Sequence, residues 1–148
     1  MSGTRWTTLL AAALLGVCTL GACGEERAAV EGRKLLEAVD AIAEEGPIGP
    51  RREQVERLAR LPLSTPALRA TRQACLEAHR ALLDAEEAQD RARRIVEAAR
   101  PSGAPFGPRE RAEAERWLAR ADEAIARSRK AAPRCEEGIG RLRLKLRP

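Results

Sequence analysis

Aromatic side chains and histidine are nearly absent from this chain of 148 residues. It contains two tryptophans, one phenylalanine, no tyrosine and a single histidine, His79. Because histidine is the side chain that most readily exchanges a proton near neutral pH, few groups remain to act as a general base. The scarcity of aromatic residues and a net charge of only +5 also argue against nucleic acid as a partner.

Motifs of catalysis and cofactor binding are missing as well. The sequence has no glycine-rich phosphate loop, no nucleophile elbow and no His-Glu-x-x-His. Glu77 and His79 are two residues apart, which does not match the Glu-x-x-His pairs of di-iron helical bundles. We therefore expect no enzyme and no cofactor. Catalytic turnover that is lost when His79 is substituted would instead support an enzyme.

No apolar run is long enough to span a bilayer. The longest runs over 14 residues from Thr7 to Leu20, after a short segment that carries Arg5. A positive residue followed by an apolar run of this length is typical of an export signal rather than of a transmembrane helix.

The four residues Leu20-Gly21-Ala22-Cys23 end this run and resemble the lipobox of bacterial prolipoproteins. The resemblance covers residues 1–23 only. It implies a signal peptide over residues 1–22 and a mature chain that begins at Cys23, with lipid such as palmitate on its sulfur and amine. In enteric bacteria Asp after the lipidated cysteine holds such proteins at the inner membrane, so Gly24 favours the outer membrane. An ordinary secretory signal cut nearby would instead leave Cys23 as a thiol.

The composition after the predicted cleavage site favours helices with a thin core. Only 23 of the 126 residues from Cys23 onward are Leu, Ile, Val or Phe, whereas Ala, Arg, Glu and Leu are abundant. We expect an all-α fold, an elongated three- to four-helix bundle built on a long antiparallel helical hairpin. Residues 23–148 would form a single domain.

Proline and glycine divide this domain into four predicted helices, at about residues 25–45, 50–61, 65–100 and 108–146. Gly46-Pro47 would end the first helix, Thr65-Pro66 would begin the third, and Gly107-Pro108 would open the fourth. Because the apolar phase continues past Pro133, we expect a kink there and not a chain reversal. The simplest arrangement is an up-down-up bundle whose first arm is broken at Gly46–Pro50.

The two long helices each carry an apolar row with alternating spacings of three and four. The predicted row of the third helix is Leu68, Thr71, Cys75, Ala78, Leu82, Ala85, Gln89, Ala92, Val96 and Ala99. That of the fourth helix is Ala114, Leu118, Ala121, Ile125, Ser128, Ala132, Cys135, Ile139 and Leu142. Leu76 and Leu83 form a second stripe, which predicts contact between the third helix and a further helix.

The two cysteines of the predicted domain other than Cys23 occupy these rows. Cys75 lies 25 residues before Arg100 and Cys135 lies 27 residues after Pro108, so an antiparallel hairpin places them nearly level. An exported chain folds in an oxidising compartment, and two cysteines are an even number. We therefore predict a disulfide between Cys75 and Cys135.

A metal site is the alternative for the same residues. Cys75 and His79 are four residues apart on one helix face, and Cys135 should lie close to them. A structural zinc site needs a fourth ligand, for which only Glu136 or Glu137 is nearby. The competing function is thus a soft-metal or redox-responsive binder, which free thiols in a thiol titration would distinguish from a disulfide.

Charged residues form two further patterns. Acidic side chains around Asp84–Asp90 have arginines four residues later, Arg91 after Glu87 and Arg94 after Asp90, which is typical of a solvated helix face. At the C-terminus Arg141, Arg143, Lys145 and Arg147 alternate with leucine. This tail either contacts an anionic surface or supplies the cations that suit a helix end.

Taken together, these patterns predict a lipid-anchored helical lipoprotein of the cell envelope that acts as a non-enzymatic interaction or structural module. The N-terminal lipid would bind the membrane, and an envelope protein or an anionic envelope polymer would be the partner. Confinement to the membrane raises the effective concentration of such a module toward a membrane-bound partner.

Overall fold

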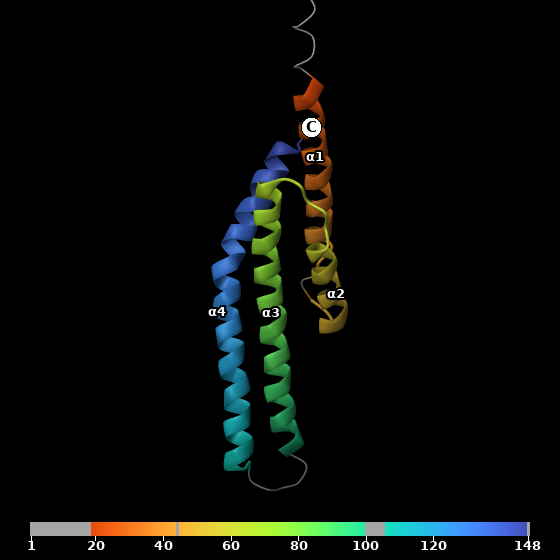
Figure 1. The fold of residues 1–148 in the computed structure, drawn as a ribbon. Helices are drawn as coiled ribbons and strands as arrows, with labels where there is room; N and C mark the ends of the chain where they lie inside the picture. The colour runs from red at the N-terminus through yellow and green to blue at the C-terminus, as the bar shows by residue number, and fades with distance from the viewer. Residues whose placement is uncertain (1–18, 44, 100–105, 148) are drawn as a thin grey trace, which may run out of the picture.

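The computed structural model describes residues 19–43, 45–99 and 106–147, with side chains from residue 24 onward. Four helices follow one another: α1 (Thr19–Asp40), α2 (Ile48–Ala59), α3 (Pro66–Ala99) and α4 (Pro108–Lys145). As predicted, α3 and α4 form a long antiparallel hairpin, and α1 and α2 lie beside the half that contains the start of α3 (Figure 1). The predicted leader falls largely on residues 1–18, outside the described residues.

The predicted broken first arm is wrong, because α1 and α2 are antiparallel neighbours. The backbone amide of Ala43 donates to Gln54 Oε1 at 3.0 Å, and its carbonyl accepts from Arg51 Nε at 3.1 Å. Gly46 takes a φ of +116°, a conformation that favours glycine and lets the chain reverse. The first helix therefore ends at Asp40 and not near residue 45.

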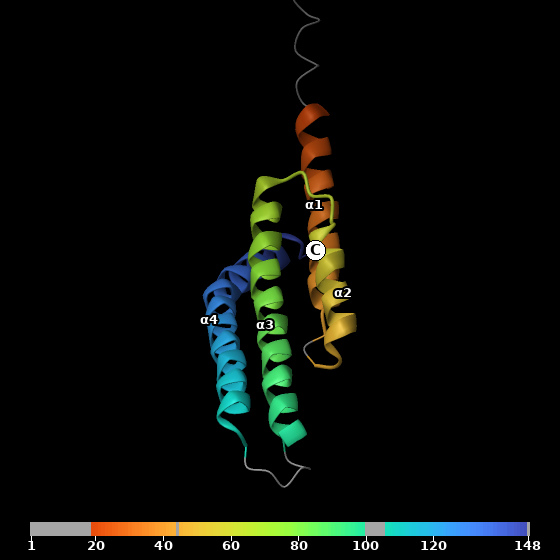
Figure 2. The same cartoon turned by 60° about the horizontal axis from the view of Figure 1, so that its bottom comes forward.

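The starts of the two long helices agree with the expected proline positions. α3 begins at Pro66, and α4 begins at Pro108 after Gly107, whose extended backbone makes it the N-cap. Helix α4 continues through Pro133 without reversal. Its C-terminal part inclines toward α1, as Figure 2 shows. Residues 100–107 connect the end of α3 to the start of α4, and only Phe106 and Gly107 of this segment are among the described residues.

The predicted rows of α3 and α4 are confirmed in part, and a second line of small residues is buried beside them. Buried members of the predicted rows are Leu68, Cys75, Ala78, Ala85 and Ala92 in α3 and Ala114, Ala121, Cys135, Ile139 and Leu142 in α4. The small residues buried beside them are Ala74, Ala81 and Ala88 in α3 and Ala124, Ala131 and Gly138 in α4. Leu82, Val96 and Leu118, predicted to lie in these rows, are instead 38%, 37% and 49% exposed. Small side chains allow the two backbones to approach closely, whereas leucines between them would hold the helices apart.

The larger apolar side chains gather where all four helices meet. One cluster unites Leu35 and Ile42 of α1 with Val55 and Leu58 of α2 and with Leu76 and Leu83 of α3, among others. Leu76 and Leu83 are 4% and 2% exposed. The second stripe predicted for the third helix is thus confirmed as a helix-packing surface.

Candidate functional site

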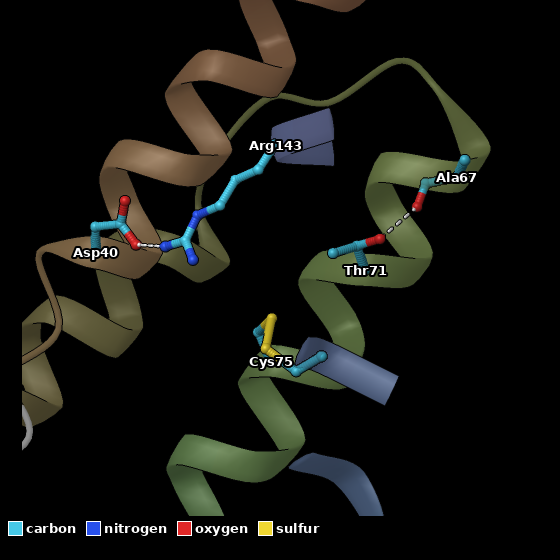
Figure 3. The surroundings of a disulfide bond; sticks show 6 residues. Asp40, Ala67, Thr71, Cys75 and Arg143 are labelled. Atoms are coloured by element: carbon cyan, nitrogen blue, oxygen red, sulfur yellow. Dashed lines mark hydrogen bonds and ion pairs between the residues drawn. A yellow bond between two sulfur atoms is a disulfide. The ribbon is translucent and has the colours of Figure 1, made fainter. Parts of the chain in front are cut away.

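Cys75 and Cys135 form the predicted disulfide between α3 and α4. Their Cα atoms are 4.7 Å apart, and the two residues are 0% and 7% exposed. Figure 3 shows this bond below the first turns of α3, near Thr71, whose hydroxyl donates to the Ala67 carbonyl. With the two sulfur atoms bonded to each other, neither is a thiolate available to a metal in this oxidised form.

The only histidine lies beside a buried arginine. His79 is half-buried on α3, and its pKa is lowered from 6.5, first by burial and second by the positive charge of Arg51. Glu136 and Glu137, the proposed fourth ligands, are exposed. Among the described side chains, no three His, Cys, Asp or Glu residues are grouped so that they would hold a metal ion.

Arg51 is the charged centre of the contact between α2 and α3. Its guanidinium donates to both carboxylate oxygens of Glu86, at 2.5 and 3.0 Å, and its side chain is only 6% exposed. Such a two-pronged pair fixes both distance and orientation. Glu86, predicted to belong to a solvated helix face, is only partly solvated: its side chain is 31% exposed and pairs with Arg51 of α2.

The neighbouring acidic residues behave more nearly as predicted. Glu87 pairs with Arg91 at 3.3 Å, the predicted partner, and also with Arg52 of α2 at 2.9 Å. Asp90 pairs with Arg93 at 2.5 Å and not with the predicted Arg94. Both spacings of three and four bring side chains together on a helix, so the sequence alone does not select between them.

Glu31 joins α1 to the start of α3, a role that the sequence pattern did not reveal. Its carboxylate accepts from the Ser64 hydroxyl at 2.7 Å and from the Ser64 amide at 2.8 Å, and Arg27 lies 3.2 Å away. The Ser64 hydroxyl first, and then the Ser64 amide, lower the pKa of Glu31 to about 2. The only sequence signal was the presence of free backbone amides at a helix start, which attract a carboxylate.

A groove of about 950 Å³ lies between the first half of α1, the start of α3 and the end of α4. Small and apolar side chains make up much of its wall: Ala28, Ala29, Ala67, Leu68, Ala70, Ala74, Gly138, Leu142 and Leu146. Charged residues from α1, α3 and α4 also line it, and two of them, Glu77 and Arg134, pair at 2.8 Å.

Three of the four basic C-terminal residues, Arg141, Arg143 and Lys145, belong to the last turns of α4, and Arg147 follows the helix. Arg143 pairs with Asp40 of α1 at 2.6 Å, visible in Figure 3, and Arg141 pairs with Glu137. Leu142 is buried beside Gly32 of α1, which is also buried. Helix formation thus continues to Lys145, as the helix-end interpretation predicts, while contact with an anionic surface stays a prediction for Arg141, Arg143, Lys145 and Arg147.

Cys23, the predicted lipidation residue, lies in the backbone of α1, and its side chain is outside the described part. Within the described residues, no helix has both the length and the apolar character needed to cross a bilayer. No protein-family model, curated protein or solved structure matches this chain.

Proposed function

We propose that this chain is a lipid-anchored lipoprotein of the cell envelope, favouring the outer membrane, that acts as a non-enzymatic interaction module. The sequence Leu20-Gly21-Ala22-Cys23 after a short apolar run carries the proposal. The disulfide between Cys75 and Cys135 supports export, because such bonds persist mainly in oxidising compartments.

The described part of α1 is compatible with cleavage before Cys23. Residues 24–27 are exposed, and the first buried residue of the described side chains is Glu31. The first member of the apolar cluster is Leu35. Cleavage would therefore leave the apolar cluster intact, and the lipid would be attached eight residues before Glu31 and twelve before Leu35.

Anchoring at Cys23 would place one end of the molecule at the membrane. The start of α1, the start of α3 and the end of α4 all lie at this end (Figure 1). The groove and the basic residues Arg141, Arg143, Lys145 and Arg147 would then face the headgroup region, where cations are attracted to anionic lipids or polymers. Two or more acyl chains hold a protein stably, whereas one gives only marginal binding.

Metabolic labelling of the full chain with an alkyne fatty acid tests the proposal. We expect label on the wild type and on Cys18→Ala, the matched control within the leader, but none on Cys23→Ala. The mass of the purified protein should show the loss of residues 1–22 only where Cys23 is present. Unchanged labelling of Cys23→Ala would contradict the anchor.

If the wild type is labelled at Cys23, crosslinking of the labelled protein in cells would identify its envelope partner.

A further inference from the structure

Two apolar rows run along the α3–α4 hairpin, and only half of each row is covered. The α3 row repeats every seven residues: Leu68, Cys75, Leu82, Gln89 and Val96. Leu68 and Cys75 are 8% and 0% exposed, whereas Leu82 and Val96 are 38% and 37% exposed. Residues seven apart lie on one side of a helix, so the same side changes from buried to exposed along its length.

The row on α4 changes in the same way. Its members are Leu118, Ile125, Ala132, Ile139 and Leu146. Ile139 is 6% exposed and Leu146 packs against the apolar cluster, whereas Leu118 is 49% exposed. The covered members of both rows lie in the half of the hairpin beside α1 and α2.

The cover ends where the first two helices end. The ion pairs from α2 to the far part of α3 stop at Glu86 and Glu87, and Figure 1 shows α1 and α2 extending only to the middle of α3. Beyond this level a hollow of about 400 Å³ lies on the hairpin, lined by Gln89, Ala92, Arg93, Val96, Glu97, Ala114 and Leu118. Gln89, Val96 and Leu118 lie beyond this level, and Leu82 and Ile125 continue the same rows to the level of the start of α2. We call these five residues the distal face.

Charges of opposite sign flank the distal face on its two helices. Arg93 lies four residues after Gln89 and three before Val96, so it borders the row of α3. Glu115 and Asp122 lie three residues before and four after Leu118, so they border the row of α4. Arg93 is 65% exposed and pairs only with acids of its own helix among the described residues. Exposed pairs of this kind are weak and exchange readily.

We propose that the distal face binds the distal face of a second copy of this chain, with the two-fold axis along the hairpin. Each α3 would then lie against α4 of the other copy, so that four helices pack together in the part of the pair where each copy has only α3 and α4. The antiparallel hairpin places Arg93 nearly level with Glu115 and Asp122, because Cys75 is level with Cys135. The axis therefore brings Arg93 of one copy between these two acids of the other.

The orientation rests on the proposed lipid anchor, because two chains in one membrane have the same end toward it. The α3 part of the distal face, from Leu82 to Val96, is about 21 Å long, which is short for a dimer that is stable in solution. Attachment to one membrane raises the effective concentration of each copy for the other. Pairing is accordingly a property of the anchored chain.

Photocrosslinking of the full chain in cells tests this pairing. A p-benzoylphenylalanine residue replaces Val96 on the distal face or, as the matched control, exposed Ala98 two residues later on the other side of α3. We expect a crosslinked dimer from the Val96 position and none from the Ala98 position. Equal crosslinking at both positions, or capture of other proteins alone from Val96, would overturn the proposal.

Charge reversal tests the arrangement of the two copies. We expect Arg93→Glu to lower the dimer yield from the Val96 position about five-fold or more, because like charges then face each other. The pair Glu115→Arg with Asp122→Arg should do the same, and the three changes together should restore the yield. Circular dichroism and the intact disulfide confirm that each variant folds. No restoration by the triple variant would overturn the two-fold pairing.

Acyl labelling of the same samples separates this proposal from the anchor. Labelled Cys23 without a dimer overturns the pairing alone. A dimer without label overturns the anchor and the argument for orientation, while the distal face remains the contact.

Discussion

At the scale of single residues, the carboxylate of Glu31 links the stability of the fold to pH. It receives two hydrogen bonds from Ser64, so its charged form is stabilised in the fold and its pKa falls from 4.5 to about 2. The unfolded chain lacks these bonds and keeps the higher pKa. The contribution of Glu31 to stability is therefore complete above pH 4.5 and is lost as the pH falls toward 2.

We predict that Glu31→Gln lowers the melting temperature at pH 7, because the amide replaces a charged acceptor with a weaker one. The difference from the wild type should shrink between pH 4.5 and pH 2, as the wild-type carboxyl takes up its proton. Thermal denaturation followed by circular dichroism measures both effects. Glu26→Gln, an exposed change on the same helix, is the control and should alter little. A constant difference across this pH range would contradict the assignment.

His79 gives a second titration that is simple to follow, because it is the only histidine of the chain. Burial and the charge of Arg51 lower its pKa below 6.5, so the unfolded chain binds a proton that the folded chain resists. Protonation of His79 thus opposes folding, and stability should decrease as the pH falls through 6.5.

We predict that Arg51→Gln raises the pKa of His79, since the substitution removes a nearby positive charge. Titration of the single imidazole signal by nuclear magnetic resonance measures this shift. Arg52→Gln alters the adjacent arginine, whose side chain is 44% exposed, and should leave the signal nearly unchanged. Equal shifts in the two variants would argue that Arg51 has no special role.

At the scale of helices, the sequence predicted the four segments well because proline and glycine act locally. Pro66 and Pro108 fix helix starts through their own backbone geometry. Which residues lie between α3 and α4 depends on how closely the two helices approach each other. The apolar pattern of one helix does not contain this distance. Leu82 and Ala81 are adjacent and both apolar, yet Ala81 is 4% exposed and Leu82 is 38% exposed.

The closeness of α3 and α4 can be tested at Gly138. A Cβ atom there would lie 2.6 Å from Thr71 Cγ2 and 3.0 Å from Thr71 Cβ, whereas one at Gly140 would meet nothing within 4 Å. We predict that Gly138→Ala destabilises the protein by about 1–3 kcal/mol through overpacking. Gly140→Ala should stabilise it by up to about 1 kcal/mol, because alanine favours helix. Urea denaturation compares the two, and equal effects would contradict the close approach.

At the scale of the whole molecule, the disulfide closes a segment of 60 residues across the hairpin. We predict that Cys75→Ala with Cys135→Ala lowers the free energy of unfolding by about 4 kcal/mol, mainly because the unfolded chain regains freedom. Denaturation with and without reductant measures the effect. Reductant should destabilise the wild type by a similar amount and leave the double variant unchanged. A sensitive double variant would show that the effect of reductant has another origin.

Long-range connections limit what could be predicted about the candidate site. The disulfide was predictable, because two cysteines at equal distances from one turn become level in a hairpin. The contacts of Glu31 with Ser64 and of Arg51 with Glu86 were not, because they require α2 to run antiparallel to α1. That reversal depends on a turn at Gly46 whose geometry the sequence leaves open.

The length of α3 sets how far the molecule extends from the proposed anchor. Its 34 residues extend for about 51 Å from the end that the proposed anchor would hold. The far end of α3 would then meet other molecules at a defined distance from the bilayer. Adding seven residues to each long helix would increase this distance by about 10 Å while keeping the small side chains in phase. The number of helical turns in α3 and α4 would thus set the distance between the bilayer and the far end of the hairpin helices.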